Sequence, residues 1–418
     1  MAVTPAAKLS ASGLQSPANL EWACPATSSS RGAALGTTAV HAVQELLAEA
    51  VAADAAEPEA ELAAFRTPAD EDTLGSPGPD SRDRGALRCM LALADAFVAA
   101  RRPCRELLLA VAGAVERRAV RLDVAVAARP APSRPALAAS VGEPSVLLER
   151  GALRVLWKPA GWTVTVGNER EEGWVLPAGA SAGGSAPAVA SHLPPGGELQ
   201  EWVASRFGAA EPIARDARAG HGLVHRLDRD TSGAVLCASS YRGYYLAQLA
   251  FVLRRVRKQY VCLCHGHVPA APRLMEQPLR TLYRRGIRWR SVVAEDGRSA
   301  CTELQAVGHL VCQDGLPLSL VELRLHTGRM HQVRVHLAHL GHALVGDAAY
   351  GRGAAPWCPR LFLHARRLAI DTGDGPLVVQ APLPANLRTS LAGLTGLGSP
   401  GRALLLRWAG GGPEAGGA

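Results

Sequence analysis

The sequence predicts an α+β protein with a mixed, largely antiparallel sheet and flanking helices. Residues 258–268 and 318–325 alternate apolar and polar side chains, which is typical of strands. Helical segments are interspersed between such strands at irregular intervals. Short connections between strands also predict hairpins, for example one that pairs Trp289 to Val293 with Thr302 to Val307.

The N-terminal part of the chain shows no motif with a chemical function. Residues 1–40 are rich in Ala, Ser and Thr with one acid, which fits either an organelle transit peptide or a disordered leader. Residues 41–130 form an Ala-rich helical region in which 67–85 has the composition of a linker and helical spacing resumes at 86–127. A docking or spacer role is the default interpretation, and the actual role stays open.

A domain of mixed elements is expected at residues 145–390. It begins with two short strands around a turn at Gly151, followed by a flexible insertion at 165–198. Later elements are expected to be helices over 199–208 and 244–257, strands over 234–238, 258–268 and 318–325, and a helix that ends at Gly341. Residues 396–418 are expected to be a disordered Gly-rich tail.

Charge and cysteine content narrow the class of protein. The 418 residues include 45 Lys and Arg against 37 Asp and Glu, a net charge of +8 that weakly favours a polyanionic partner. Nine cysteines without paired spacing argue against a disulfide framework, so we expect an intracellular, reducing location, whether cytoplasm, plastid or mitochondrion. No apolar run is long enough to span a bilayer. We expect a monomer with no membrane association and no obligate protein partner.

The stretch HRLDRDTSG, residues 225–233, has the spacing of a calcium loop but lacks its last ligand. The twelfth position, which should be a bidentate Glu, is Ser239. Five histidines between His326 and His342 also lack the i, i+4 spacing and added carboxylate of a helical metal site, and arginines lie among them. We therefore expect no metal and no other cofactor.

A carboxylate next to a fixed arginine is the alternative. Such a carboxylate stays ionised in a partly buried loop and can act as a nucleophile or base. Asp228 has Arg226 two residues before it, and Arg334 lies on the polar side of a predicted helix. Tyr260 offers an aromatic face and a hydroxyl. From the residues alone, a plain structural salt bridge remains the competing interpretation.

The ordered motifs resemble those of the RluA-type RNA pseudouridine synthases. HRLDRDTSG is similar to the HRLDxxTSG signature of that family, KPAG at 158–161 to its first motif, and KQY at 258–260 to its tyrosine motif. The block TGRMHQVRVHLAHLGHALVGDAAYG, residues 327–351, is similar to its longest motif. The resemblance covers about residues 145–387 and implies the pseudouridine synthase fold and isomerisation of uridine in RNA, with ribosomal RNA the first expected target and transfer RNA the second.

The resemblance also implies roles for single residues. Asp228 would be the catalytic carboxylate, Tyr260 would pack on the uracil and serve the proton step at C5, and Arg334 would pair with Asp228. Arg226 would occupy the space left by the flipped nucleotide. Further substrate contacts are expected from four residues, namely His225, Thr231, Arg329 and His331. Met330 departs from the family, which usually has Thr or Ser there.

Two basic runs are candidates for RNA contact. The first, residues 279–291, interleaves five arginines with Tyr283 and Trp289, and the second is RRVRK at 254–258. A solvated charged face is the alternative interpretation for both runs.

Overall fold

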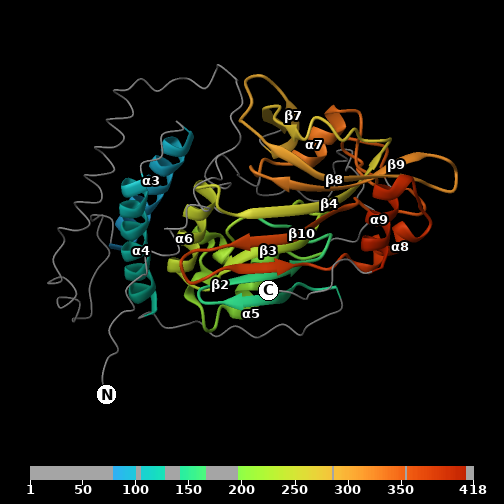
Figure 1. The fold of residues 1–418 in the computed structure, drawn as a ribbon. Coiled ribbons are helices and arrows are strands. Elements are labelled where there is room, and N and C mark those ends of the chain that lie inside the picture. Colours follow the sequence, from blue (N-terminus) through green and yellow to red (C-terminus); the bar gives the residue numbers. More distant parts are fainter. Residues whose placement is uncertain are drawn as a thin grey trace.

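The computed structural model describes residues 79–99, 105–127, 142–165, 196–284, 287–353 and 355–410. At its centre is a ten-stranded sheet with the order β1-β2-β3-β10-β4-β9-β8-β12, with β11 beside β10 and β5 beside β8 (Figure 1). The strands are β1 (Ser145–Arg150), β2 (Leu153–Lys158), β3 (Ser232–Ala238), β4 (Arg257–His265), β5 (Leu274–Met275), β8 (Thr302–Val311), β9 (Pro317–Leu325), β10 (Leu363–Ile370), β11 (Leu377–Gln380) and β12 (Thr395–Gly396).

The predicted mixed, largely antiparallel sheet is confirmed. Strands β3 and β10 run parallel, and every other strand pair in the sheet is antiparallel. Where β3 starts beside β10, Gly233 adopts a positive φ of 127°, and a Cβ there would lie 2.3 Å from the carbonyl oxygen of Ala365. A side chain cannot fit at this position, which explains why a glycine ends the HRLDRDTSG stretch.

The predicted hairpin between Trp289 to Val293 and Thr302 to Val307 is wrong in its partners. Strand β7 (Ile287–Val293) pairs with β6 (Leu279–Arg284) in a separate two-stranded sheet, while β8 pairs with β9. Both segments are strands as predicted. Which strand pairs with which depends on tertiary packing, and alternation within a segment does not encode it.

One face of the sheet is covered by helices at both ends. Helix α6 (Tyr241–Val252) packs over β2, β3 and β10, and α8 (Ala385–Ala392) and α9 (Gly398–Ala409) pack over β4, β8 and β9 (Figure 1). Helices α3 (Pro79–Ala99) and α4 (Arg105–Ala127) pack against α6 on the side away from the strands (Figure 1). No helix in the described part of the chain is long and apolar enough to cross a membrane.

The N-terminal helices share a core with the residues that follow them. Buried Leu87 and Val115 belong to the same apolar cluster as Leu236 of β3. Asp123 accepts hydrogen bonds from the backbone N–H groups of Tyr241 and Arg242 at 2.7 and 3.0 Å, which supplies an N-terminal cap for α6. Helices α3 and α4 therefore form a second layer that packs against α6. This contact argues against a purely spacer role.

Two predictions at the ends of the described chain are corrected. Helix α3 begins at Pro79, inside the segment expected to be linker, because proline is tolerated in the first turn of a helix. Residues 398–409, expected to belong to a disordered tail, form α9, and Trp408 is only 2% exposed. The expected leader at 1–40, most of the insertion at 165–198 and residues 411–418 lie outside the described residues.

The opposite face of the sheet carries the site. It is covered by α5 (Leu199–Phe207), by two short 3-10 turns at Pro212–Arg215 and Ala217–Gly222, and by α7 (Gln332–His339). Alternation along β4 directs Tyr260, Cys262 and Cys264 to this face. The helices predicted near 199–208 and before Gly341 are confirmed by α5 and α7.

Candidate active site

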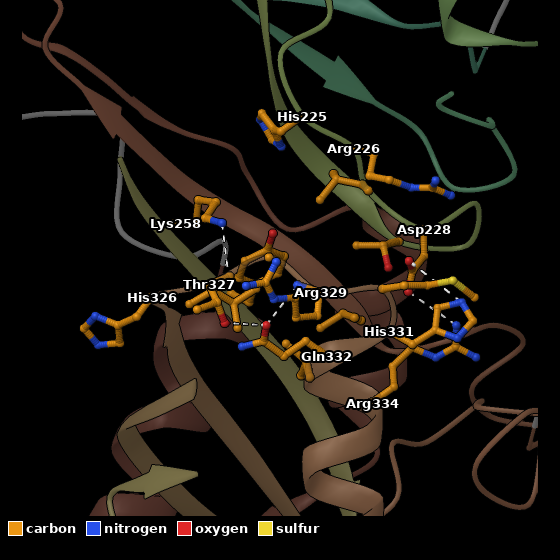
Figure 2. Close-up of a pocket in the computed structure, with 18 of the residues that line it drawn as sticks. His225, Arg226, Asp228, Lys258, His326, Thr327, Arg329, His331, Gln332 and Arg334 are labelled. Atoms are coloured by element: carbon orange, nitrogen blue, oxygen red, sulfur yellow. Dashed lines mark hydrogen bonds and ion pairs between the residues drawn. The ribbon is translucent and has the colours of Figure 1, made fainter. Parts of the chain in front are cut away.

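A pocket of about 330 Å³ lies where three segments of the chain meet. These are the loop at 224–231 before β3, strand β4, and the segment 325–334 that leads into α7 (Figure 2). The volume is in the range of sites for small ligands or single nucleotide units. All of the predicted site residues line this one pocket, namely His225, Arg226, Asp228, Thr231, Tyr260, Arg329, His331 and Arg334.

The loop that carries Asp228 is held by a buried lysine. The Nζ of Lys158, at the end of β2, donates to the carbonyl oxygens of Pro159, Arg229 and Thr231 at 2.8 to 2.9 Å. Lys158 is fully buried, and burial lowers the pKa of its ammonium to about 7. The KPAG motif contributed to the family resemblance, but Lys158 was not predicted as a site residue, and this anchoring role could not be read from the sequence.

The pairing predicted between Arg334 and Asp228 is confirmed. Nη1 of Arg334, on the first turn of α7, donates to Oδ2 of Asp228 at 3.3 Å. The other side of the guanidinium makes two hydrogen bonds of 2.8 Å to the carboxylate of Asp347, whose side chain is completely buried. Asp347 also accepts from the backbone N–H groups of Ala349 and Tyr350. It fixes the plane in which Arg334 meets Asp228.

The surroundings of Asp228 keep it ionised. Burial acts to raise the pKa of this carboxyl group, but the nearby charges of His331, Arg334 and Arg226 lower it further than burial raises it. The net pKa therefore lies below the ordinary value of an aspartate. The side chain of Asp228 is 18% exposed and faces the pocket, so a charged carboxylate oxygen is available to a ligand.

Tyr260 brings an intact phenol to the pocket next to this carboxylate. The residue lies on β4 in the middle of the sheet and is 6% exposed. Burial, together with the negative charge of Asp228, raises the pKa of its hydroxyl well above the usual value. The hydroxyl therefore keeps its proton at neutral pH, and the ring presents an apolar surface to a ligand.

A short hydrogen-bonded chain links the pocket to the β6-β7 hairpin. The hydroxyl of Tyr350 donates to the carbonyl of Ser291 on β7 at 3.0 Å and accepts from the Ser291 N–H at 2.8 Å. It also lies 3.0 Å from Nδ1 of His331, whose Nε2 lies 4.0 Å from Oδ1 of Asp228. The Tyr350 hydroxyl and the His331 ring share one hydrogen bond, and the tautomer of His331 decides which of them donates. Neither Tyr350 nor Ser291 was predicted as part of the site.

The segment before α7 is fixed by Gln332. Its side-chain oxygen accepts from the Thr327 hydroxyl at 2.7 Å and from the Arg329 N–H at 3.0 Å, and its side-chain nitrogen donates to Cys301 and Thr302. This arrangement places Arg329 and Met330 along the wall of the pocket. The sequence made no prediction for the effect of Met330, which stands where the family usually has a hydroxyl residue, and that effect stays open.

The other predicted contact residues differ in what they offer a ligand. Arg226 is exposed at the pocket. The ring nitrogen Nε2 of His225 already accepts from the Leu236 N–H at 2.9 Å, and burial lowers the pKa of this histidine to about 3, so the ring is neutral. The hydroxyl of Thr231 is buried and has no hydrogen-bond partner among the described residues. Arg226 thus presents an exposed cation at the pocket, whereas the Thr231 hydroxyl is a buried polar group at its edge that lacks a hydrogen bond within the described part of the chain.

The histidines of the segment 326–342 have separate partners. His326 pairs with Glu303, His336 contacts Thr302 and the carbonyl of Gln277, and His342 contacts the carbonyl of His265. Within the described ranges, no three His, Cys, Asp or Glu side chains gather closely enough to hold a metal ion.

The two basic runs are placed differently. In the first run, Arg280 pairs with exposed Asp296, and the Arg290 guanidinium lies 4.4 Å from the centre of the Tyr350 ring. The structure does not describe the other side chains of this run that were expected to contact RNA, namely the arginines at 284, 285 and 288 and Trp289. In the second, Arg254 and Lys258 line the pocket, while Arg257 is exposed.

Comparison with known proteins identifies the family. Residues 153–339 match the model of the family described as RNA pseudouridylate synthase. An uncharacterised RNA pseudouridine synthase of Zymomonas mobilis is 35% identical over 164 residues, which are 39% of this chain and 73% of that protein. The chain therefore belongs to the RNA pseudouridine synthase family, as the motif resemblance implied.

Two further relatives match over a smaller share of their length. An uncharacterised RNA pseudouridine synthase of Mycobacterium bovis is 37% identical over 185 residues, 42% of this chain and 57% of that protein. The ribosomal large subunit pseudouridine synthase C of Buchnera aphidicola is 32% identical over 130 residues, 31% of this chain and 40% of that protein. The chain thus spans about half the length of these relatives.

Proposed function

We propose that the protein isomerises uridine to pseudouridine within RNA. The observation that carries the proposal is the position of Asp228, an ionised carboxylate held by Arg334 and placed in one pocket with the ring of Tyr260. The reaction breaks the N-glycosidic bond, turns the uracil and rejoins it to the ribose through C5. A positioned carboxylate and a site that excludes water supply what this chemistry requires.

Each residue of the pocket has a distinct task in this proposal. Asp228 attacks the nucleoside as a nucleophile, which its lowered pKa permits at neutral pH. Tyr260 packs against the uracil and serves the proton step at C5, where a hydrogen is lost when the new carbon bond forms. The proton removed from C5 is balanced by one gained at N1, so substrate and product are isomers. Thr231 offers its unpartnered hydroxyl to the base.

The uridine must leave the RNA stack to reach this pocket. Flipping a nucleotide costs a few kcal/mol, which contacts with the flipped base and the phosphates must offset. Arg226 is exposed beside Asp228 and is suited to fill the space that the nucleotide leaves. The positive side chains around the pocket favour the negatively charged backbone of RNA.

Ribosomal RNA is the first target we propose, with transfer RNA second. The similarity to a ribosomal large subunit pseudouridine synthase supports this order. Intracellular location and a monomeric state stay predictions.

The test is conversion of uridine by the purified protein. We expect the wild type to form pseudouridine in ribosomal or transfer RNA from cells that lack the protein, and we expect the Asp228→Ala variant to form none. Binding of RNA by both proteins without conversion by either would identify an RNA-binding protein on the same fold. That outcome would overturn the enzymatic proposal.

Mapping of pseudouridines across cellular RNA with and without the protein would then name the target. A site lost in the absence of the protein and restored by the wild type, but not by Asp228→Ala, identifies the modified position. Restoration by both proteins would contradict the assignment of Asp228.

A further inference from the structure

A second group of positive charges lies at the end of the pocket away from Asp228 and Arg334. It consists of Arg254, Lys258 and Arg329, which we call the basic end of the pocket. Figure 2 shows Lys258 on the side of the site away from Asp228 and Arg334, with Arg329 between them. This group has no part in the chemical steps assigned above.

Lys258 is a buried cation without a carboxylate partner in the pocket. The residue is 9% exposed, and its Nζ makes one long hydrogen bond of 3.4 Å to the carbonyl of Thr327. Burial, followed by the charges of Arg254 and Arg329, lowers the pKa of this ammonium to about 8. Among the described residues that line the pocket, the single carboxylate is Asp228, which Arg334 engages. A buried charge is costly unless an opposite charge accompanies it.

The two arginines are held in place by backbone carbonyls. Nη1 of Arg254 donates to the carbonyl of His326 at 3.3 Å, and Nε of Arg329 donates to that of Ser299 at 3.0 Å. Arg254 has a positive φ of 57°, a strained conformation for a residue that carries a side chain. A carbonyl carries no net charge and does not neutralise a guanidinium. Both arginines therefore keep their positive charge at the basic end of the pocket. Asp95 on α3, the acid whose charge acts on Arg329, is exposed and does not line the pocket.

The class of ligand is inferred from the position of Lys258 relative to Tyr260. Both side chains point to the same face of β4 because they are two residues apart, a separation of about 6.7 Å along a strand. Lys258 therefore lies within one nucleotide's length of a base that packs against Tyr260. We propose that Arg254, Lys258 and Arg329 form a subsite for one phosphodiester of the RNA backbone next to the uridine in the pocket. This inference rests on the proposed function, because the ligand at Tyr260 is taken to be a nucleotide.

Glycine at 328 leaves room for this contact. A Cβ at Gly328 would lie 3.1 Å from Nζ of Lys258, closer than nearly all such contacts in proteins. The ring of Phe251 lies 5.4 Å from the same nitrogen and shields the other side. The ammonium is thus confined between a ring and a backbone segment, and a compact anion such as a phosphate oxygen can approach it from the pocket.

The first experiment measures how RNA affinity depends on salt. For single-stranded RNA, each neutralised phosphate contributes about 0.7 to the slope of log K against log salt concentration. We expect Lys258→Met to lower this slope by about 0.7 when a labelled ten-nucleotide oligouridylate is titrated with the full-length protein. Arg254→Asn should also lower it, and asparagine tolerates the positive φ at this position. Arg402→Gln, an exposed change on α9, is the matched control and should leave it unchanged.

The second experiment asks which phosphate is bound. A UpUpU trinucleotide is compared with two versions in which either phosphodiester is replaced by a neutral methylphosphonate. At one of the two positions, the methylphosphonate should weaken binding of the trinucleotide to the wild type as much as the Lys258→Met substitution weakens binding of the unmodified trinucleotide. The same methylphosphonate should cause no further loss of affinity in the Lys258→Met protein. Equal losses in both proteins would overturn the subsite. A third outcome is that the trinucleotide displaces bound inorganic phosphate while neither methylphosphonate replacement changes its affinity. That result would assign the site to free phosphate and would likewise overturn the phosphodiester subsite.

Neither readout needs isomerisation, so the two proposals can fail separately. If the wild type modifies uridine but Lys258→Met and Arg254→Asn keep the wild-type salt slope, the subsite is wrong and the enzyme stands. If both slopes fall while no uridine is converted, the phosphate subsite stands and the enzymatic proposal fails. Lys258→Met should fold, because it removes a buried positive charge that lies near two other positive charges. Arg254→Asn provides an independent test.

Discussion

Arg334 and Asp347 are joined by two parallel hydrogen bonds of 2.8 Å, from Nε to Oδ2 and from Nη2 to Oδ1. This bidentate contact uses one side of the guanidinium and leaves Nη1 directed at Asp228. Burial of Arg334 acts to lower its pKa, but the hydrogen bonds that it donates to Asp347 and the charge of Asp228 raise the pKa above the usual value. Asp347 therefore orients the cation that keeps Asp228 ionised.

Replacing Asp347 by asparagine tests this orientation. The amide can accept from one N–H of Arg334 but not both, so the guanidinium loses its fixed plane. Hydrogen bonds to charged groups contribute about 1.5 to 3 kcal/mol, and we expect kcat to fall roughly 10- to 100-fold. RNA affinity should change much less, because Asp347 does not line the pocket. The measurement is a single-turnover assay beside a binding titration.

The exposed turn between β8 and β9 provides the control for that variant. Asp314→Asn removes a carboxylate from the surface and should leave both quantities within twofold of the wild type. An Asp347→Asn protein with wild-type kcat would show that Arg334 keeps its position without this partner.

Tyr350 couples the β6-β7 hairpin to the active-site helix. Tyr350→Phe removes the hydroxyl that contacts both backbone groups of Ser291 and the ring of His331. The Ser291 N–H then loses its partner, and we expect a loss of about 1 to 3 kcal/mol in the free energy of unfolding. Activity should fall too, since His331 is no longer held against Asp228. Urea denaturation and the uridine assay measure the two effects.

Tyr283 on β6 serves as the comparison. It is 55% exposed, so Tyr283→Phe should change the free energy of unfolding by less than about 0.5 kcal/mol. Equal stability of the two variants would mean that the chain from Ser291 to His331 contributes nothing to the fold.

The buried ammonium of Lys158 predicts how stability depends on pH. Burial lowers its pKa from 10.5 to about 7. Between these values the unfolded chain binds a proton that the folded protein does not, so this group makes stability rise with pH, by at most about 1.4 kcal/mol per pH unit. Below about pH 7 both states are protonated and its contribution no longer changes.

Lys158→Met isolates this contribution. Urea denaturation at pH 7.5, 8.5 and 9.5 should show a steeper rise for the wild type than for the variant. Lys258 contributes in the same direction in both proteins and cancels in the difference. Parallel profiles would indicate that Lys158 keeps its proton in the folded protein throughout this range.

The motifs in the sequence predicted residues that line one pocket, but not the residues that support them. Asp228, Tyr260 and Arg334 could be found because they lie in motifs with a recognisable order. The supporting contacts of Lys158 and Asp347 depend on which backbone and side-chain groups the fold brings together, and no local pattern encodes that. The predicted strands were also more reliable than the predicted pairing of β7, because alternation reports burial and not the partner strand.

Glycine content misled the prediction for the C-terminal segment. Residues 396–401 contain three glycines and were expected to be disordered. In the structure, a Cβ at Gly401 would lie 2.2 Å from the carbonyl oxygen of His309 on β8, so glycine here permits a close approach between helix and strand. The apolar residues of α9 that follow then pack on the sheet. Their spacing was the signal that could have identified the helix.

Trp408 tests whether α9 is part of the folded domain. Its ring is buried, and its Nε1 donates at 2.9 Å to Glu322 on β9, which Arg366 and Arg407 also contact. We expect Trp408→Ala to lower the free energy of unfolding by about 3 to 5 kcal/mol. Leu406 on the same helix is 75% exposed, so Leu406→Ala should change it by less than about 0.5 kcal/mol. Equal melting temperatures for the wild type and Trp408→Ala would instead support the interpretation of this segment as a disordered tail.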